Sequence, residues 1–216
     1  MVLIDQEGSY IHGSIKGNLV HLFRDVIVEG EIYSIANFEI VDNRTRFRVV
    51  GDNKHMIQIN AESTVRPAPG QLPNIAMHRF DLLDFDKVPM RKGLDYILTD
   101  VVGQVCSEGE VTNKNVYDRT VKSLMLELQD LRGAKMRITL WGKTVDEYTT
   151  QKATILGSVI VGVFTSNLVK EYMKTTTLSS TTATKVFLDV GIDEVAALKT
   201  KLTSAELNDY WSRSLL

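Results

Sequence analysis

The sequence contains a single cysteine, Cys106, among 216 residues. One cysteine excludes an intrachain disulfide and a zinc site made of several cysteines, so we expect a reducing compartment. Neither sign of charge dominates, since 25 Lys and Arg residues stand against 27 Asp and Glu residues. The whole chain therefore has no general attraction for a polyanion. Only the stretch 100–185 is slightly basic, with 11 Lys and Arg against 9 Asp and Glu.

Long hydrophobic runs are also missing. The longest apolar stretch, A-T-I-L-G-S-V-I-V-G-V-F (153–164), is shorter than the roughly 20 residues of a membrane-spanning helix and is typical of a buried strand. The N-terminus lacks the basic start and the apolar core of a signal peptide. We therefore expect a soluble intracellular protein with no membrane partner.

Catalytic motifs are absent as well. The sequence has no G-x-x-x-x-G-K-[ST] loop, no H-E-x-x-H and no histidine near its cysteine. The acidic segment D-L-L-D-F-D (81–86) is more typical of caps and solvated turns than of paired catalytic carboxylates. We expect no enzymatic activity, no cofactor and no bound metal.

What the sequence does contain is an internal repeat. Residues 4–20 align without gaps on residues 129–145, and both copies read as a strand, a D-x-x-G turn and a second strand that ends at glycine. A short helix-compatible stretch follows in each copy. The matched pairs are Asp5 and Asp130, Gly8 and Gly133, Ile11 and Met136, Ser14 and Thr139, Ile15 and Leu140, Gly17 and Gly142, and Val20 and Val145.

Further strands follow each copy of the repeat. We align 31–41 with 154–164 and 56–61 with 184–188, so that each copy forms a small β-barrel. Three of the four prolines lie in 66–74 and mark a linker between the barrels. Helical spacing with an N-cap at Ser204 predicts helices at the C-terminal end. The predicted boundaries are a first barrel at 1–65, a linker at 66–95, a second barrel at 96–190 and C-terminal helices at 191–216.

The strand M-R-I-T-L-W (136–141) raises a question about its tryptophan. Alternate side chains of a strand face opposite ways, so Met136, Ile138 and Leu140 would point inward. Arg137 and Trp141 would then share the outer face with Thr139. An exposed aromatic ring beside a cation suits a nucleic-acid base, which stacks on the ring while the cation binds phosphate. A role in the core is the alternative, and the residue pattern leaves the two about equally balanced.

Several motifs together resemble a known family. They are I-D-Q-E-G-S-Y-I-H-G-S-I (4–15), R-F-R-V-V (46–50), L-x-D-V-V-G (98–103), L-E-L-Q-D-L-R-G (126–133), T-L-W-G (139–142) and S-S-T-T-A-T-K-V-F-L (179–188). This combination resembles the large subunit of replication protein A, with plant relatives closest. The resemblance implies a mainly β protein with two tandem five-stranded oligonucleotide-binding (OB) folds that grip single-stranded DNA. The first fold would lack its first strand, and nothing matches the family's third, zinc-bearing OB-fold.

The resemblance also implies stacking aromatics. In the second barrel they fall on Trp141 and Phe164, and in the first on Phe47, with Lys16 where a second ring would be. For Phe47 a place in the core is the alternative, because it shares a face with Val49. For Phe164, which ends an apolar strand, a hydrophobic plug is as good an interpretation as a platform for a base.

Basic residues complete the predicted binding site. Two loops would flank the groove of the second barrel, one at 113–122 and one after Phe164. The strand with Trp141 and the start of the next helix add further cations, and the first barrel offers its own set. The predicted DNA-binding residues, besides the aromatics, are Lys114, Arg119, Lys122, Arg137, Lys143, Lys170, Tyr172 and Lys174 in the second barrel, and His12, Lys16, Arg44, Arg46 and Arg48 in the first.

The sequence therefore predicts a nuclear protein that binds single-stranded DNA without reading its sequence and serves replication, repair or recombination. Other replication protein A subunits or repair proteins are the expected protein partners. The alternative is an OB-fold module for protein–protein interaction that has lost most DNA affinity, because OB-folds serve both purposes. A C-terminal helix pair with Leu198, Leu202, Leu207 and Trp211 either docks such a partner or packs within the molecule.

Overall fold

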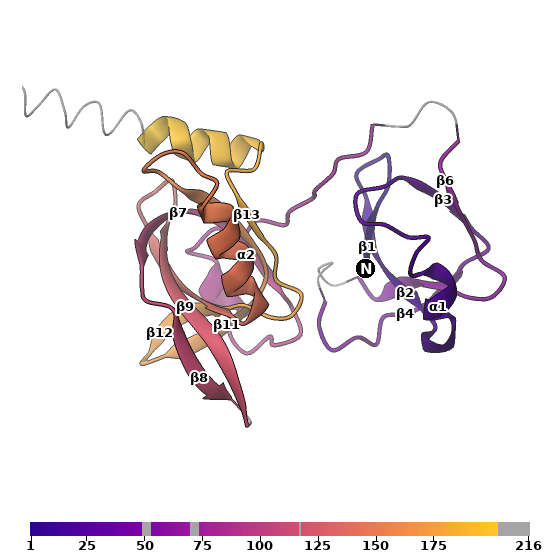
Figure 1. Cartoon of the computed structure of the whole chain (residues 1–216), viewed down its shortest axis with the longest axis horizontal. Coiled ribbons are helices and arrows are strands. Elements are labelled where there is room, and N and C mark those ends of the chain that lie inside the picture. The colour runs from indigo at the N-terminus through magenta and orange to yellow at the C-terminus, as the bar shows by residue number, and fades with distance from the viewer. Residues whose placement is uncertain (49–52, 70–73, 117, 203–216) are drawn as a thin grey trace, which may run out of the picture. The chain divides into compact units, whose positions relative to one another are not determined.

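The computed structural model describes residues 1–48, 53–69, 74–116 and 118–202. The chain divides into two compact units, Met1–Arg79 and Phe80–Leu216 (Figure 1). Both are built mainly from β-strands, as predicted. In the described part of the chain, no helix has the length and apolar character needed to cross a membrane.

Unit 1 contains two small sheets. The four-stranded sheet has the order β1-β2-β5-β4, and β3 pairs with β6 in a second sheet. A 3-10 helix at Gly17–Leu19 and the short helix α1 (Val20–Phe23) follow β2. The strands are β1 (Val2–Ile4), β2 (Tyr10–Ile15), β3 (Tyr33–Ala36), β4 (Glu39–Asp42), β5 (His55–Ile59) and β6 (Thr64–Pro67).

Unit 2 is a closed barrel. Each of its five main strands pairs with two others, in the circular order β7-β9-β10-β12-β11 and back to β7, and only the β10–β12 pair is parallel. β8 extends the sheet beyond β9, and β13 pairs with β11. The elements are β7 (Thr99–Glu108), β8 (Thr112–Val116), β9 (Arg119–Gln129), β10 (Lys135–Trp141), α2 (Lys143–Lys152), β11 (Val161–Tyr172), β12 (Thr175–Ser179) and β13 (Val186–Leu188), preceded by a 3-10 helix at Val88–Arg91.

The two units differ sharply in their cores. Among the described residues, twenty hydrophobic side chains are buried in unit 2 and only two, Met56 and Ile59, in unit 1. The barrel interior of unit 2 is filled by alternate residues of its strands together with Val145 and Tyr148 of α2. The Tyr148 hydroxyl donates to Glu108 at 2.9 Å, and burial is the main cause that raises the pKa of this tyrosine. The unit whose sheet closes into a barrel is therefore also the unit with the larger buried core.

The predicted repeat is visible in the turn that opens each copy. In unit 1 the Asp5 carboxylate accepts the backbone N–H groups of Glu7 and Ser9 at 3.0 and 2.8 Å. Asp130 does the same for the residues two and four positions after it, at 2.9 and 2.8 Å. A glycine with positive φ, 75° in one unit and 85° in the other, completes each turn. The offset of 125 residues predicted for this segment is confirmed.

Downstream, the repeat continues with another offset. A residue with φ near +55° recurs in each unit: Asn37, between β3 and β4 of unit 1, and Ser166, within β11 of unit 2. Its carbonyl accepts a hydroxyl hydrogen bond in both, from Ser63 at 3.1 Å and from Thr184 at 3.0 Å. The pairs Asn37–Ser166 and Ser63–Thr184 differ by 129 and 121 positions.

These correspondences correct the downstream alignment made from sequence. Residues 31–41 match 160–170, not 154–164, and 184–188 match β6, not the strand at 56–61. Apolar strands have similar sequences, and the hydrogen bonds that distinguish them cannot be read from the sequence. Sequence similarity alone therefore aligned the downstream strands of the two units with the wrong offset.

The segment assigned to the end of the linker also differs from the prediction. Residues 80–95 belong to unit 2, where Leu82 forms a bridge to Asp100 and Phe85 and Val88 are buried in the barrel core. The reason is their apolar side chains, which pack into the barrel core. The division between the units lies after Arg79.

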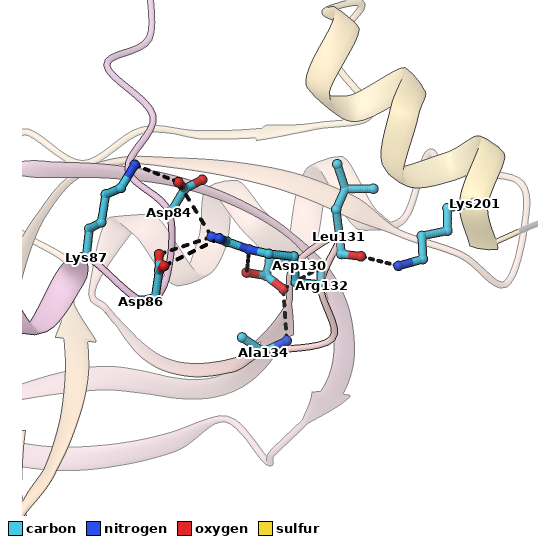
Figure 2. A network of polar contacts seen from close by, with 8 residues as sticks. All are labelled: Asp84, Asp86, Lys87, Asp130, Leu131, Arg132, Ala134 and Lys201. Carbon is cyan, nitrogen blue, oxygen red and sulfur yellow. Dashed lines mark hydrogen bonds and ion pairs between the residues drawn. The ribbon is translucent and has the colours of Figure 1, made fainter.

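An ion-pair network holds this segment to the turn between β9 and β10 (Figure 2). Arg132 lies 3.0 Å from Asp86 and 3.5 Å from Asp84, which Lys87 also contacts at 2.8 Å. Lys201, from the C-terminal helix, donates to the carbonyl of Leu131 in the same turn.

Residues 193–202 form the predicted helix at the C-terminal side. Val195 and Leu198 are buried against Val161 and Val163 of β11, and Leu202 packs at the edge of this cluster. Leu198 and Leu202 therefore pack within the molecule. Leu207, Trp211 and the N-cap predicted at Ser204 lie outside the described residues.

Candidate nucleic-acid interface

The orientation predicted for β10 is confirmed. Met136, Ile138 and Leu140 point into the barrel core, with exposures of 6, 0 and 0%. Arg137 is exposed, and Trp141 is half-buried on the other side of the strand. Alternation along one strand therefore places a cation and an aromatic ring on the outer face of the barrel.

Neighbouring strands extend this outer face on both sides of β10. Arg137 is directly opposite Glu127 of β9 and Thr177 of β12, and Thr177 is in turn opposite Lys170 of β11. Residues directly opposite each other across a sheet share a face. The outer face, as we use the term, comprises the outward residues of β8 to β12 in this register: Thr112, Lys114, Val116, Arg119, Val121, Ser123, Met125, Glu127, Gln129, Lys135, Arg137, Thr139, Trp141, Leu168, Lys170, Tyr172, Thr175, Thr177 and Ser179.

The indole of Trp141 is held in place by hydrogen bonds. Its Nε1–H donates to the hydroxyl of Ser179 at 3.0 Å, and its backbone N–H donates to the hydroxyl of Ser180 at 2.8 Å. The ammonium group of Lys114 lies 5.6 Å from the centre of the indole ring, within cation–π range. The ring is thus oriented before any ligand arrives, which lowers the entropic cost of stacking on it.

Residues 113–116 and 119–122 pair as a β-hairpin, where the sequence predicted a loop. β8 and the start of β9 pair from Thr112 with Ser123 to Val116 with Arg119, and this hairpin projects from the barrel in Figure 1. Polar side chains on both faces hide the strand pattern in the sequence, because all five residues of β8 are exposed. The outer side of the barrel is therefore flanked by a paired β-hairpin.

The hairpin separates the three cations that the sequence grouped together. Lys114 and Arg119 lie on the same face as Trp141. Ser123 is directly opposite Trp141, and the strand register places Lys114 and Arg119 on the same side of the hairpin as Ser123. Lys122 points to the opposite face, where it forms a 2.6 Å ion pair with Asp146 of α2. Lys122 is therefore not part of the outer face, a correction that follows from the period of two in a strand.

One carboxylate lies among the cations of the outer face. Glu127 contacts Lys135 at 2.7 Å and Arg137 at 4.0 Å. The hydrogen bond from Lys135 is the main cause that lowers the pKa of Glu127, and the same contact raises the pKa of Lys135. Arg137 and Lys135 are thus partly neutralised, which leaves Lys114 and Arg119 as cations of this face with no carboxylate directly opposite them in the sheet.

The residues after Phe164 also continue a strand, where a loop was predicted. β11 runs to Tyr172, and the turn to β12 consists of Met173 and Lys174, with φ of 48° and 62°. Lys170 pairs with Asp95 at 3.6 Å, and Tyr172 is 64% exposed. Lys170 and Tyr172 share the outer face, with Lys174 at the tip of their hairpin.

Phe164 is a core residue, which corrects its prediction as a stacking platform. Its ring is 0% exposed and packs within the barrel interior. β11 is covered on both sides at this point, because Val161 and Val163 pack against the C-terminal helix while Phe164 faces the barrel. Such a strand shows no alternation in sequence, so the exposed face could not be assigned.

Lys143 lies just beyond the outer face. It is the first residue of α2, and its ammonium group lies 3.4 Å from Glu147 one turn later. Gly142 adopts φ of +54° between β10 and α2, a conformation that favours glycine.

The residues predicted in unit 1 do not form a comparable site. His12, predicted to bind DNA, is only 7% exposed and therefore does not lie on an exposed face. Its Nδ1 lies 2.9 Å from the amide nitrogen of Asn43. Burial, followed by the nearby N-terminal ammonium group, lowers the pKa of His12. Lys16, which matches Trp141 in the repeat, forms an exposed ion pair with Glu39 at 3.7 Å.

The predicted strand 46–50 is not seen in its described part. Residues 46 and 47 form a bend, Arg48 forms an isolated bridge, and 49–50 lie outside the described residues. Arg46 stacks over the half-buried Phe47 at 5.2 Å, and Arg44 pairs with Asp42 at 3.8 Å. An open groove nearby has a mixed lining of Ser14, Val41, Asp42, Arg44, Thr45, Met56 and Gln58.

Some residues of the outer face were missed from sequence. Ser179 and Ser180 fix Trp141, and Thr177, Met125 and Lys135 share its face. The alternation in T-T-T-L-S (175–179), with Leu178 1% exposed, carries the signal that could have placed Thr177 and Ser179 outward. In the described parts of both units, no group of three or more His, Cys, Asp or Glu side chains is arranged to hold a metal ion.

Comparisons with known proteins agree with this geometry. Residues 1–90 match the family described as a domain of unknown function, DUF223. A 70 kDa DNA-binding subunit of replication protein A from Arabidopsis thaliana is 25% identical over 142 residues, which are 65% of this chain and 16% of that protein. Replication factor A protein 1 of Schizosaccharomyces pombe is 24% identical over 156 residues, 71% of this chain and 25% of that protein. A solved replication protein A heterotrimer bound to single-stranded DNA covers 92% of this chain, and 45% of the matched chain, with a TM-score of 0.61 and 19% identity.

The chain is an OB-fold protein that is similar to the large subunit of replication protein A. It spans between a sixth and a quarter of the length of these two curated relatives. A 134-residue match at 28% identity to human FH1/FH2 domain-containing protein 3 also occurs and covers 9% of that protein. In this OB-fold protein the tandem repeat corresponds to the two units, of which only unit 2 has a closed barrel among the described residues.

Proposed function

We propose that the protein binds single-stranded DNA, without reading its sequence, on the outer face of unit 2. The observation that carries this proposal is the half-exposed indole of Trp141, fixed by Ser179 and overlain by Lys114 on a face that also carries Arg137. The relatives support the choice of ligand, because one is named a DNA-binding subunit and the solved heterotrimer is bound to single-stranded DNA.

The mechanism needs no catalytic step. A base stacks on Trp141, and Lys114 and Arg119 neutralise adjacent phosphates, with Arg137 contributing as DNA competes with its contact to Glu127. Stacking of one base on an aromatic side chain contributes roughly 1 to 3 kcal/mol and tolerates any base. Phosphate contacts carry no sequence information and weaken with salt.

In this proposal unit 1 contributes less than unit 2. The position that matches Trp141 holds Lys16, which is paired with Glu39 and offers no ring for stacking. A role of unit 1 in protein–protein interaction is the second candidate function, favoured by the unpaired sheet edges among its described strands. We place the whole protein in nuclear DNA replication, repair or recombination, together with replication protein A subunits or repair proteins.

The test is fluorescence anisotropy of a labelled oligo-dT of about 30 nucleotides, with a duplex of equal length as the control. We expect salt-sensitive binding to the single strand and much weaker binding to the duplex. Binding that prefers the duplex, or no binding of the single strand at low salt, would contradict the proposal.

A further inference from the structure

The cations of the outer face differ in what they contact. The cations on β8 and at the start of β9 have no carboxylate directly opposite them in the sheet. Those on β10 and β11 each form an ion pair with a carboxylate. The outer face carries one carboxylate, that of Glu127, and five cations, which are Lys114, Arg119, Lys135, Arg137 and Lys170.

Glu127 contacts two of these cations from a central strand. It projects from β9, which is paired on both edges, and lies directly opposite Arg137. Its carboxylate lies 2.7 Å from the ammonium group of Lys135 and 4.0 Å from the guanidinium group of Arg137. The hydrogen bond from Lys135 lowers the pKa of Glu127, so this carboxyl group is ionised at neutral pH. One negative charge thus faces two cations of the predicted DNA site.

Lys170 has a carboxylate partner of its own. Arg137, Thr177 and Lys170 are successive neighbours across β10, β12 and β11. Because neighbouring strands lie about 4.8 Å apart, Arg137 and Lys170 are separated by roughly 10 Å with a hydroxyl group between them. Asp95, which precedes β7, lies 3.6 Å from the ammonium group of Lys170. Both cations of this row are therefore paired within the molecule.

These ion pairs are open to exchange with a phosphate. The side chains of Lys135, Arg137 and Lys170 are 57, 56 and 48% exposed, and ion pairs this exposed contribute little to stability. The Glu127 side chain is only 25% exposed and is fixed on a central strand. A phosphate that replaces Glu127 at Arg137 therefore stays close to the negative charge that it displaced, which repels it.

A positioning role for Glu127 is the alternative, and the geometry argues against it. A carboxylate that orients a guanidinium group typically binds it through two parallel hydrogen bonds. Asp86 holds Arg132 in this way, at 3.0 and 3.4 Å (Figure 2). The contact from Glu127 to Arg137 is a single one, at 4.0 Å to Nε.

We propose that two carboxylates, Glu127 and Asp95, limit the DNA affinity of the outer face. In the free protein they occupy three of its five cations, and in the complex they repel the phosphates that replace them. The affinity is thereby set below what the cations and Trp141 alone would give. This inference rests on the proposed DNA binding by unit 2 and names a regulating element of that same site.

The test is the affinity of Glu127→Gln for labelled oligo-dT, measured by anisotropy across a range of salt concentrations. Glutamine keeps the size of the side chain and removes its charge. We expect binding about 3- to 10-fold tighter than the wild type at low salt, with a gain that shrinks as salt rises. The slope of log affinity against log salt should become steeper by roughly 1, because freed cations contact phosphates.

A second variant and a matched control accompany it. Asp95→Asn should tighten binding by a smaller factor, about 2- to 3-fold, because the Asp95 side chain is 62% exposed and more strongly screened by solvent. Asp146→Asn changes the net charge by the same amount as Glu127→Gln but frees Lys122 on the opposite face of the hairpin. It should change the affinity less than about twofold. NMR spectra of the variants show that each is folded.

Equal or weaker binding by Glu127→Gln, beside a wild type that binds, would overturn the inhibitory role and leave the proposed DNA site intact. An equal gain in Asp146→Asn would overturn it too, since net charge alone would then explain the effect. No binding of oligo-dT by the wild type or any variant would overturn the DNA site together with its inhibition. Binding by Glu127→Gln alone would support the inhibition and contradict DNA binding by the wild type.

Discussion

Unit 1 and unit 2 share their turns but not their cores. The aspartate turn, the residue with φ near +55° (Asn37 in unit 1 and Ser166 in unit 2) and the hydroxyl that binds its carbonyl recur in both. Yet among the described residues unit 2 buries twenty hydrophobic side chains and unit 1 buries two. Local hydrogen bonds therefore set the course of the chain in both units, whereas the larger core goes with the closed sheet of unit 2.

The largest expected effect comes from core truncation at matched positions. Leu140 of unit 2 is 0% exposed, and its repeat partner Ile15 is half-buried. Leu140→Ala should lower the free energy of unfolding of unit 2 by about 2 to 5 kcal/mol. Ile15→Ala should cost unit 1 well under half as much. Urea unfolding followed by NMR, which reports each unit separately, checks this, and equal losses would show that the two cores are equally complete.

The aspartate turns should respond alike, in contrast to the cores. Asp5→Ala and Asp130→Ala each remove a carboxylate that accepts two backbone N–H groups. We expect each to lower the stability of its own unit by on the order of 1 to 2 kcal/mol. Asp5→Asn and Asp130→Asn, which keep an acceptor oxygen, are the controls and should cost less in the same urea experiment.

Acid should weaken unit 1 selectively. Burial lowers the pKa of His12 in the folded state below its ordinary value of 6.5, so the unfolded chain binds the proton more tightly. The contribution of neutral His12 is present above pH 6.5 and is lost as the pH falls below that value towards the lowered pKa. All four histidines precede residue 80, so unit 2 has none. Urea unfolding at pH 7 and pH 5 should show the loss in unit 1, and His12→Gln should reduce it.

The two faces of the β8–β9 hairpin offer a smaller and more specific test. Lys114 lies over Trp141, whereas Lys122 pairs with Asp146 on the other face. Lys114→Ala should weaken oligo-dT binding a few-fold and reduce the slope of log affinity against log salt by about 1. Lys122→Ala, the matched control, should leave the slope unchanged. Equal slopes for the two variants would show that the face of the hairpin that carries Lys114 does not bind DNA.

The sequence was informative where a strand has one buried and one polar face. M-R-I-T-L-W alternates, so the inward Ile138 and the outward Trp141 could both be assigned. It was uninformative where that contrast disappears. β11 is buried on both sides at Phe164, and β8 is exposed on both sides at Lys114, so neither strand has a period to read.

Long-range contacts were the other limit. Ser179 accepts a hydrogen bond from the indole of Trp141, 38 positions earlier in the sequence, and no local sequence pattern predicts such a bond. The linker was predicted at 66–95 because of its prolines. The apolar residues Phe85 and Val88 in this segment pack in the barrel core, and their apolar character was the sequence signal for this packing.

The affinity of Trp141→Ala for oligo-dT, measured by anisotropy beside the wild type and Lys16→Ala, tests whether DNA binds to the outer face of unit 2. We predict a loss of roughly 5- to 150-fold for Trp141→Ala, the equivalent of about 1 to 3 kcal/mol, and little change for Lys16→Ala. Wild-type affinity in Trp141→Ala, or a larger loss in Lys16→Ala, would contradict the assignment of DNA binding to the outer face of unit 2.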